Sequence, residues 1–146
     1  MWRCLIGLIL WMPAAAPAAA PCVAACTKLE SLQDFSRQTI RVPENHPLLV
    51  TFFYEDCVLC QVQFRETACI EALGVGIAYV GVGHDKARLR QKLGSTQSSL
   101  GNFVISEKRA KSWKIAGTPW HWLYQNGRIA PMAGLITCQE FSQLVH

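Results

Sequence analysis

The pattern of apolar and polar residues predicts strands that alternate with helices. Two runs, 48–54 and 75–82, are continuously apolar, β-branched or aromatic, which is typical of strands buried on both faces of a sheet. Between them, an apolar face recurs at four-residue spacing and predicts one helix over 58–73. Two buried strands joined by a helix indicate a parallel sheet.

Turn and capping signals place the other elements. Asn126-Gly127 is typical of a type I′ turn and predicts a β-hairpin over 120–134. Asp85 and Thr137 are suited to cap the helices that follow them. The remaining predicted elements are helices over 28–38, 84–93, 106–113 and 138–145, and a loop over 94–102. The order predicts one α/β domain, with a central mixed sheet, helices on both faces, and a C-terminal β-hairpin plus helix.

The N-terminal segment has a different composition. Arg3 precedes a short apolar run, Cys4–Met12, and an Ala- and Pro-rich stretch follows. This layout is typical of a secretory signal peptide, because the run is far too short to span a bilayer. We expect a signal peptide over 1–20, cleaved at about 18–25, and a mature domain in the periplasm. Lipoprotein anchoring at Cys26 is an alternative, since the four residues ending there resemble a lipobox.

Charge and cysteine content narrow the function classes. A formal net charge of +4 is modest and gives no nucleic-acid signature. Basic residues concentrate over 86–114, where a solvated helix face explains them better than a docking patch. Cleavage after Ala18 would leave six of the seven cysteines, and in an oxidising compartment these six are candidates for disulfides or redox work. The sequence does not fix the pairing of Cys22, Cys26, Cys69 and Cys138.

Cys57 and Cys60 have a C-x-x-C spacing that suits a zinc site, a structural disulfide or a redox-active dithiol. A zinc site usually needs four ligands, and the other cysteines and the histidines show no ligand spacing. A redox dithiol, unlike a structural disulfide, requires the corner where a strand becomes a helix. There the helix dipole stabilises the Cys57 thiolate, while Cys60 lies one turn further along on the buried side. We therefore predict Cys57 as the nucleophile and Cys60 as the resolving thiol, with no metal and no cofactor.

A second motif, Gly117-Thr118-Pro119, lies between a predicted helix and the hairpin. The stretch 110–129 resembles the thioredoxin superfamily from the helix before its cis-proline to the hairpin glycine. The resemblance covers about residues 27–146, the expected domain, and includes both motifs in the right order. It implies a thioredoxin-like fold in which the loop of Thr118 and Pro119 hydrogen-bonds an extended substrate beside the C-x-x-C pair.

Within the superfamily, the chain resembles the catalytic domain of periplasmic Dsb-type (DsbC-like) disulfide isomerases. Ala72–Gly81 and the triplet ending at Pro119 carry this likeness. The chain departs from those enzymes in having no N-terminal dimerisation domain and a helical insertion shortened to 84–113. Thr51 also occupies the position where cytoplasmic thioredoxins keep a buried Asp. Small exported thioredoxin-like proteins of conjugation and secretion systems resemble this trimmed form.

Several residues beside the motifs have two interpretations. Trp120 and Trp122 alternate on one face of the predicted strand, and Trp120 is a candidate substrate-binding residue, although core packing explains at least one of the two. His121, on the other face, is a candidate proton shuttle or a structural histidine with satisfied hydrogen bonds. Glu55 and Asp56 repel a neighbouring thiolate, which favours a weakly oxidising or reducing dithiol.

These observations predict an exported thiol–disulfide oxidoreductase for disulfides of envelope or secreted proteins, an isomerase or reductase rather than a primary oxidase. Its expected partners are protein or peptide disulfides, a membrane or periplasmic redox partner and envelope secretion or conjugation machinery, without nucleic acid. A reductase for apocytochrome or one particular client is an alternative enzyme. A non-catalytic assembly factor and a metal carrier that uses Cys57, Cys60 and His121 are the alternatives from other classes.

Overall fold

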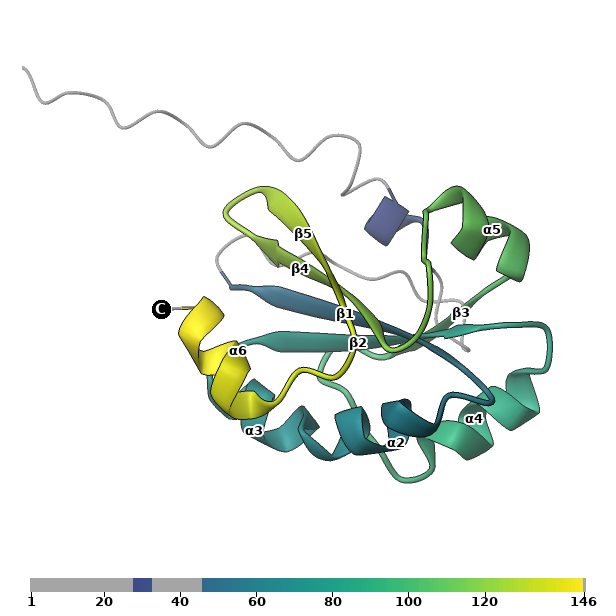
Figure 1. Ribbon diagram of the computed structural model, residues 1–146, viewed down its shortest axis with the longest axis horizontal. Coiled ribbons are helices and arrows are strands. Elements are labelled where there is room, and N and C mark those ends of the chain that lie inside the picture. Colours follow the sequence, from purple (N-terminus) through teal and green to yellow (C-terminus); the bar gives the residue numbers. More distant parts are fainter. Residues whose placement is uncertain (1–27, 33–45, 146) are drawn as a thin grey trace, which may run out of the picture.

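The computed structural model describes residues 28–32 and 46–145, and Figure 1 shows their arrangement. Residues 28–30 are helical, as predicted, but the rest of the predicted helix over 28–38 lies outside the described residues. The predicted signal peptide, its cleavage site, Cys22 and Cys26 lie outside them as well. None of the described helices is long and apolar enough to cross a membrane.

Strands and helices alternate through the first half of the domain, as the apolar pattern predicts. In chain order the elements are β1 (Leu48–Tyr54), α2 (Val58–Arg65), α3 (Thr67–Ala72), β2 (Gly76–Val82), α4 (Lys86–Leu93), β3 (Asn102–Ile105), α5 (Glu107–Ser112), β4 (Trp120–Gln125), β5 (Arg128–Ala133) and α6 (Cys138–Leu144). The capping predictions are confirmed. Asp85 accepts hydrogen bonds from two backbone amides of α4, and Thr137 forms a capping box with Glu140 at α6.

The five strands form one mixed sheet in the order β3-β2-β1-β4-β5. β1 lies at its centre, parallel to β2 and antiparallel to β4. β3 extends the parallel half beyond β2, and the hairpin of β4 and β5 forms the antiparallel half. Asn126 and Gly127 both have positive φ, 52° and 73°, which is the backbone conformation that a type I′ turn requires.

Apolar side chains fill both faces of the sheet. On one face, Leu49 and Phe53 of β1 pack with side chains from α2, α3, α4 and α6. On the other, Val50 and Phe52 pack with the helical turn at 28–30 and with α5. Figure 1 shows α2, α3, α4 and α6 together on one side of the sheet, with α5 on the opposite side. The prediction of a mixed sheet with helices on both faces is therefore confirmed.

Two elements differ from the sequence prediction. The single helix predicted over 58–73 is divided at Glu66, whose amide bonds to the carbonyl of Gln63 at 3.1 Å. There the Thr67 hydroxyl donates to the carbonyl of Phe64 at 2.6 Å, a bond that bends helices. The predicted loop over 94–102 ends in β3, which the prediction missed because four residues are too few to show a clear period.

Candidate active site

Cys57 lies at the corner between the central strand and the next helix. After β1 the chain turns, with the Cys57 amide bonded to the Tyr54 carbonyl at 3.2 Å. Cys57 is then the N-cap of α2, and its Sγ accepts a hydrogen bond from the amide of Cys60 at 3.2 Å. An N-cap sulfur is stabilised as a thiolate by the free amides and the positive end of the helix dipole.

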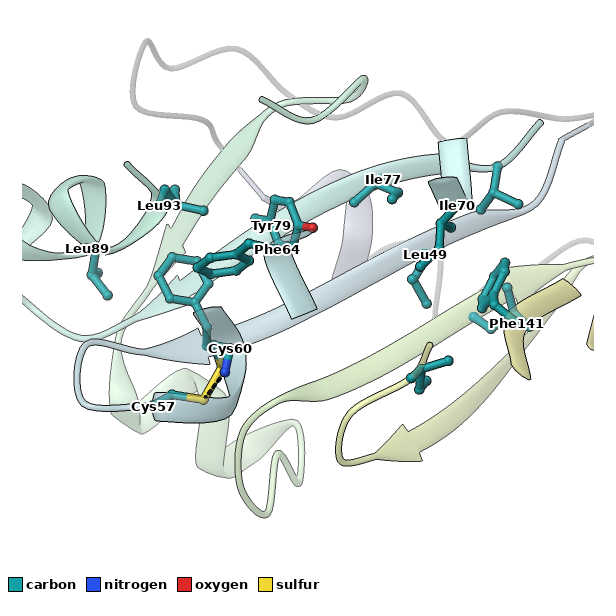
Figure 2. Packing of buried hydrophobic residues seen from close by; sticks show 14 residues of the cluster. Leu49, Cys57, Cys60, Phe64, Ile70, Ile77, Tyr79, Leu89, Leu93 and Phe141 are labelled. Atoms are coloured by element: carbon teal, nitrogen blue, oxygen red, sulfur yellow. Dashed lines mark hydrogen bonds between the residues drawn. A yellow bond between two sulfur atoms is a disulfide. The ribbon is translucent and has the colours of Figure 1, made fainter. Parts of the chain in front are cut away.

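Cys57 and Cys60 form a disulfide in this structure, and Figure 2 shows it at the edge of the core. Cys57 is 8% exposed and Cys60 is fully buried, packed in the same cluster as Phe64. An approaching sulfur therefore reaches Cys57 and not Cys60. The structure places the two cysteines as the sequence predicts for an outer, attacking thiol and an inner, resolving thiol.

The dipeptide between the cysteines is apolar and projects into solvent. Val58 is 78% exposed and Leu59 is 50% exposed, and Val62 adds an exposed apolar side chain one turn further along α2. Large apolar side chains seldom gather at the surface without a function. The surface beside Cys57 on α2 is therefore suited to contact apolar side chains of another molecule.

The surface before Cys57 is acidic. Glu55 and Asp56 are exposed, and only Glu55 has an ion-pair partner among the described residues, Arg88, at 3.4 Å. A pocket of about 340 Å³ beside them is lined partly by Asp85 and Glu107. The pKa of Tyr54, which also lines this pocket, is raised by partial burial and then by the charges of Glu107 and Asp56. These carboxylates oppose the helix end and disfavour the thiolate.

The Thr118–Pro119 loop lies at the same edge of the sheet as the dithiol. The peptide bond between these residues is cis. Trp120 opens β4 opposite Phe52, near the end of β1 that leads to Cys57, so the loop and the cysteines emerge at one edge. Pro119 is buried and Thr118 is half-buried. The substrate-binding role of the two residues stays a prediction.

Trp120 does not face the active-site helix. Its side chain packs against the cluster on the opposite face of the sheet, together with Trp122, which is 6% exposed. Trp122 contacts Phe52 edge-to-face at 4.8 Å between ring centroids. Both tryptophans therefore belong to the core on the side of α5, and this position argues against the predicted role of Trp120 in substrate binding.

His121 has the features of a structural histidine. Its side chain is fully buried, Nδ1 lies 2.8 Å from the Thr51 hydroxyl, and Nε2 lies 2.9 Å from the Gly134 carbonyl. Because a carbonyl only accepts, Nε2 carries the proton and Nδ1 accepts from Thr51. Burial lowers the pKa of His121 to about 4, although the bond to Gly134 opposes this shift. The structure contradicts the predicted role of His121 as a proton shuttle, because both ring nitrogens already have hydrogen-bond partners and neither partner is a cysteine.

Because both ring nitrogens are hydrogen-bonded, His121 is not available as the third metal ligand that the metal-carrier hypothesis requires. Among the described residues, no group of three or more His, Cys, Asp or Glu side chains is placed to hold a metal ion.

A set of polar contacts that the sequence did not reveal holds the active-site helices to the C-terminal segment. The buried amide of Gln63 donates to the Ile136 carbonyl at 3.0 Å and accepts from the Ile136 amide at 2.8 Å. Glu66 accepts from the amide of Cys138 at 2.8 Å, and Cys69 forms a disulfide with Cys138. A glutamine on the buried face of a predicted helix, three residues after Cys60, was the available signal.

Comparison with known proteins supports the fold. No family model and no curated protein sequence matches the chain. Solved structures that resemble it include a secreted disulfide oxidoreductase of Mycobacterium tuberculosis homologous to E. coli DsbE, with a TM-score of 0.62 and 11% identity over 82% of this chain and 96% of that one. The reduced N-terminal domain of PilB from N. meningitidis has a TM-score of 0.63 and 16% identity over 81% and 92% of the two chains. StoA from Bacillus subtilis has a TM-score of 0.57 and 13% identity over 79% and 94%. The prediction of a thioredoxin-like fold is confirmed.

Proposed function

We propose that this chain, with its thioredoxin-like fold, is a thiol–disulfide oxidoreductase in which Cys57 is the nucleophile and Cys60 the resolving thiol. One observation carries the proposal: the Cys57–Cys60 disulfide caps a helix directly after the central strand, with only the outer sulfur reachable. The resemblance in fold to a disulfide oxidoreductase and to StoA supports it.

The reduced form acts by two exchange steps. The Cys57 thiolate attacks one sulfur of a client disulfide, which forms a mixed disulfide and releases the other client sulfur as a thiolate. Cys60, as a thiolate, then attacks the Cys57 sulfur and releases the second client thiolate, so that the client gains two electrons and the enzyme becomes the Cys57–Cys60 disulfide. A separate membrane or periplasmic dithiol partner must reduce this disulfide again. In isomerisation, a client thiolate attacks the mixed disulfide instead, and Cys57 leaves as the thiolate.

Isomerase or reductase work suits the surroundings better than primary oxidation. Glu55 and Asp56 place negative charge next to the attacking sulfur, and a destabilised thiolate makes the disulfide a weaker oxidant. The intervening dipeptide, Val58-Leu59, contains no histidine that would stabilise the thiolate.

Export to the periplasm is part of the same proposal. It rests on the signal-like residues 1–20, on the Cys69–Cys138 disulfide, which is typical of oxidising compartments, and on the likeness to a secreted oxidoreductase. The clients are then disulfides of envelope or secreted proteins, and a conjugation or secretion machine is the proposed setting. Thr118 and Pro119 are the proposed backbone contact for an extended client.

Two activity assays test the proposal. The reduced full chain should reduce insulin and reactivate scrambled ribonuclease, and Cys57→Ser should abolish both activities. The double variant Cys69→Ser/Cys138→Ser is the matched control, because it removes a disulfide outside the proposed site and should keep them. Wild-type activity in Cys57→Ser would refute the nucleophile, and inactivity of the wild type in both assays would favour the assembly factor.

A further inference from the structure

A groove lined by aromatic rings lies on the face of the sheet opposite α2. It has a volume of about 470 Å³, and three tryptophans, Trp113, Trp120 and Trp122, form much of its wall. Ile129 and Pro131 of β5 complete the apolar part. The lining residues come from the helical turn at 28–30, the end of α5 and the β4–β5 hairpin, and Figure 1 shows where these elements lie. The volume is typical of ligand pockets, which range over about 300–1,000 Å³.

The charged side chains that line the groove are both lysines. Lys28 and Lys114 are exposed residues that contribute to its wall, and no acidic residue does so in the described part of the chain. The Lys28 ammonium lies over the Trp122 ring, 5.9 Å from its centroid, which holds the charge at the groove. The groove therefore combines an apolar wall with positive charge.

Neighbouring α5 adds to the positive potential. Lys108, Arg109 and Lys111 lie on this helix, and the guanidinium of Arg109 lies 5.8 Å from the centroid of Trp113. The one acidic residue of the helix, Glu107, lines the separate pocket beside Tyr54. The field over the groove thus favours an anion.

Lys114 has a backbone conformation that glycine would adopt at lower cost. Its φ is +60°, in the left-handed region, and it follows the last turn of α5. Its amide bonds to the carbonyl of Lys111, and the next amide, of Ile115, bonds back to Ala110, as at a helix end where glycine is usual. A lysine in place of glycine therefore has a strained backbone, and strained residues are often found at functional sites.

Trp120 supplies a further observation. Its indole Nε1–H is shielded from water and has no hydrogen-bond acceptor among the described residues. Buried donors in native proteins nearly always have a partner, so an orphaned donor calls for an explanation. Because protein atoms shield this N–H, an acceptor on a bound molecule would reach it only if the surrounding side chains move.

We infer that the groove binds a small amphiphilic anion, with an apolar body against the tryptophans and a carboxylate, sulfonate or phosphate group bound by Lys28 and Lys114. The site is separate from the dithiol, because neither Cys57 nor Cys60 lines it. The inference about the groove is therefore independent of the proposed redox function.

Dodecanoate, 1-dodecanol and dodecyltrimethylammonium share one apolar body and differ in the head group. Each ion is used below its micelle concentration, and the alcohol is used below its solubility limit. Titrated into the full chain, dodecanoate should bind one to one and quench or shift tryptophan fluorescence, with an affinity about tenfold or more above that of the other two. Lys114→Gly should raise the thermal midpoint by relieving the left-handed strain and yet weaken dodecanoate binding, leaving dodecanol unaffected. Lys86→Ala, which removes an exposed charge on α4 at the opposite face of the sheet, should leave dodecanoate binding unchanged.

Three results with the amphiphiles in solution would overturn the inference. These are an absence of saturable dodecanoate binding, equal affinities for the three amphiphiles, and a Lys114→Gly variant that binds dodecanoate like the wild type. Binding to vesicles of anionic phospholipid without binding to monomeric dodecanoate would also overturn it, since a membrane surface would then be the ligand. Because the measured quantity is binding, an inactive dithiol in Cys57→Ser does not affect the result.

Discussion

Replacing both Cys69 and Cys138 with serine should destabilise the domain strongly without preventing it from folding. The bond joins α3 to the first residue of α6, and Cys69 is exposed at the surface. Other contacts hold the same segment. Gln63 bonds to both backbone groups of Ile136, and Phe141 of α6 is fully buried. The double variant therefore keeps the anchoring contacts of α6 and loses the covalent constraint.

The size of the effect follows from the length of chain that the bond closes. The two cysteines are 69 residues apart in sequence. In the loop-entropy model, closing a loop of this length restricts the unfolded chain by about 4 kcal/mol at 25 °C. Cys57 and Cys60 are 3 residues apart, and the same model gives about 2 kcal/mol for that short loop.

Urea unfolding followed by circular dichroism measures both effects. The Cys69→Ser/Cys138→Ser variant should lose about 4 kcal/mol of unfolding free energy, and the control Cys57→Ser/Cys60→Ser should lose about half as much. Equal stability of the wild type and the Cys69→Ser/Cys138→Ser variant would contradict the expected effect of loop length. So would a greater loss in the control, because the order of the two losses follows directly from loop length.

Three further predictions concern the residues around the dithiol. Gln63→Leu should lower the unfolding free energy, measured in urea, by about 2–4 kcal/mol, because two buried backbone groups lose their partner. Its control, Gln61→Ala, breaks an exposed hydrogen bond and should cost less than about 1 kcal/mol. The unfolding free energy should fall by about 3 kcal/mol between pH 6.5 and 4. Burial lowers the pKa of His121 from 6.5 to about 4, so as the pH falls the unfolded chain is protonated at a higher pH than the folded chain. His121→Gln should flatten this profile. Asp56→Asn should raise the reduction potential of the dithiol by up to about 20 mV by removing repulsion of the thiolate, and Glu30→Gln, an exposed acid on the opposite face of the sheet, should not change it.

Each of these has a contradicting result. Equal losses in Gln63→Leu and Gln61→Ala would mean that the buried amide pair contributes no more than a surface bond. An unchanged pH profile in His121→Gln would assign the acid sensitivity to other groups. A lower potential in Asp56→Asn than in the wild type would reverse the proposed effect of the carboxylate.

Local signals made much of the fold predictable. The continuous apolar run of β1 specifies a strand buried on both faces, and the polar turn after it places Cys57 at a helix start. Asp85, Asn126 and Thr137 act within a few residues of their own positions, so their capping and turn roles are readable from the sequence.

The parts that were missed depend on contacts between distant residues. The bonds of Gln63 to Ile136 join residues 73 apart. The pairing of Cys69 with Cys138 depends on the packing of α3 beside α6, which the sequence does not show. Periodicity specifies which side of a helix is buried and not what lies opposite. For the same reason, alternation on β4 placed Trp120 and His121 on opposite faces correctly but did not show what each side chain contacts.

Trapping the mixed disulfide is the decisive experiment for the role of Cys57. In Cys60→Ser the resolving thiol is absent, so the Cys57 thiolate should stay bonded to a client such as scrambled ribonuclease. On a non-reducing gel we expect an adduct of one chain and one client. Dithiothreitol should cleave this adduct by reduction, and Cys57→Ser/Cys60→Ser should not form it. An equal yield of adduct without Cys57, or no adduct from Cys60→Ser, would contradict the assignment of Cys57 as the nucleophile.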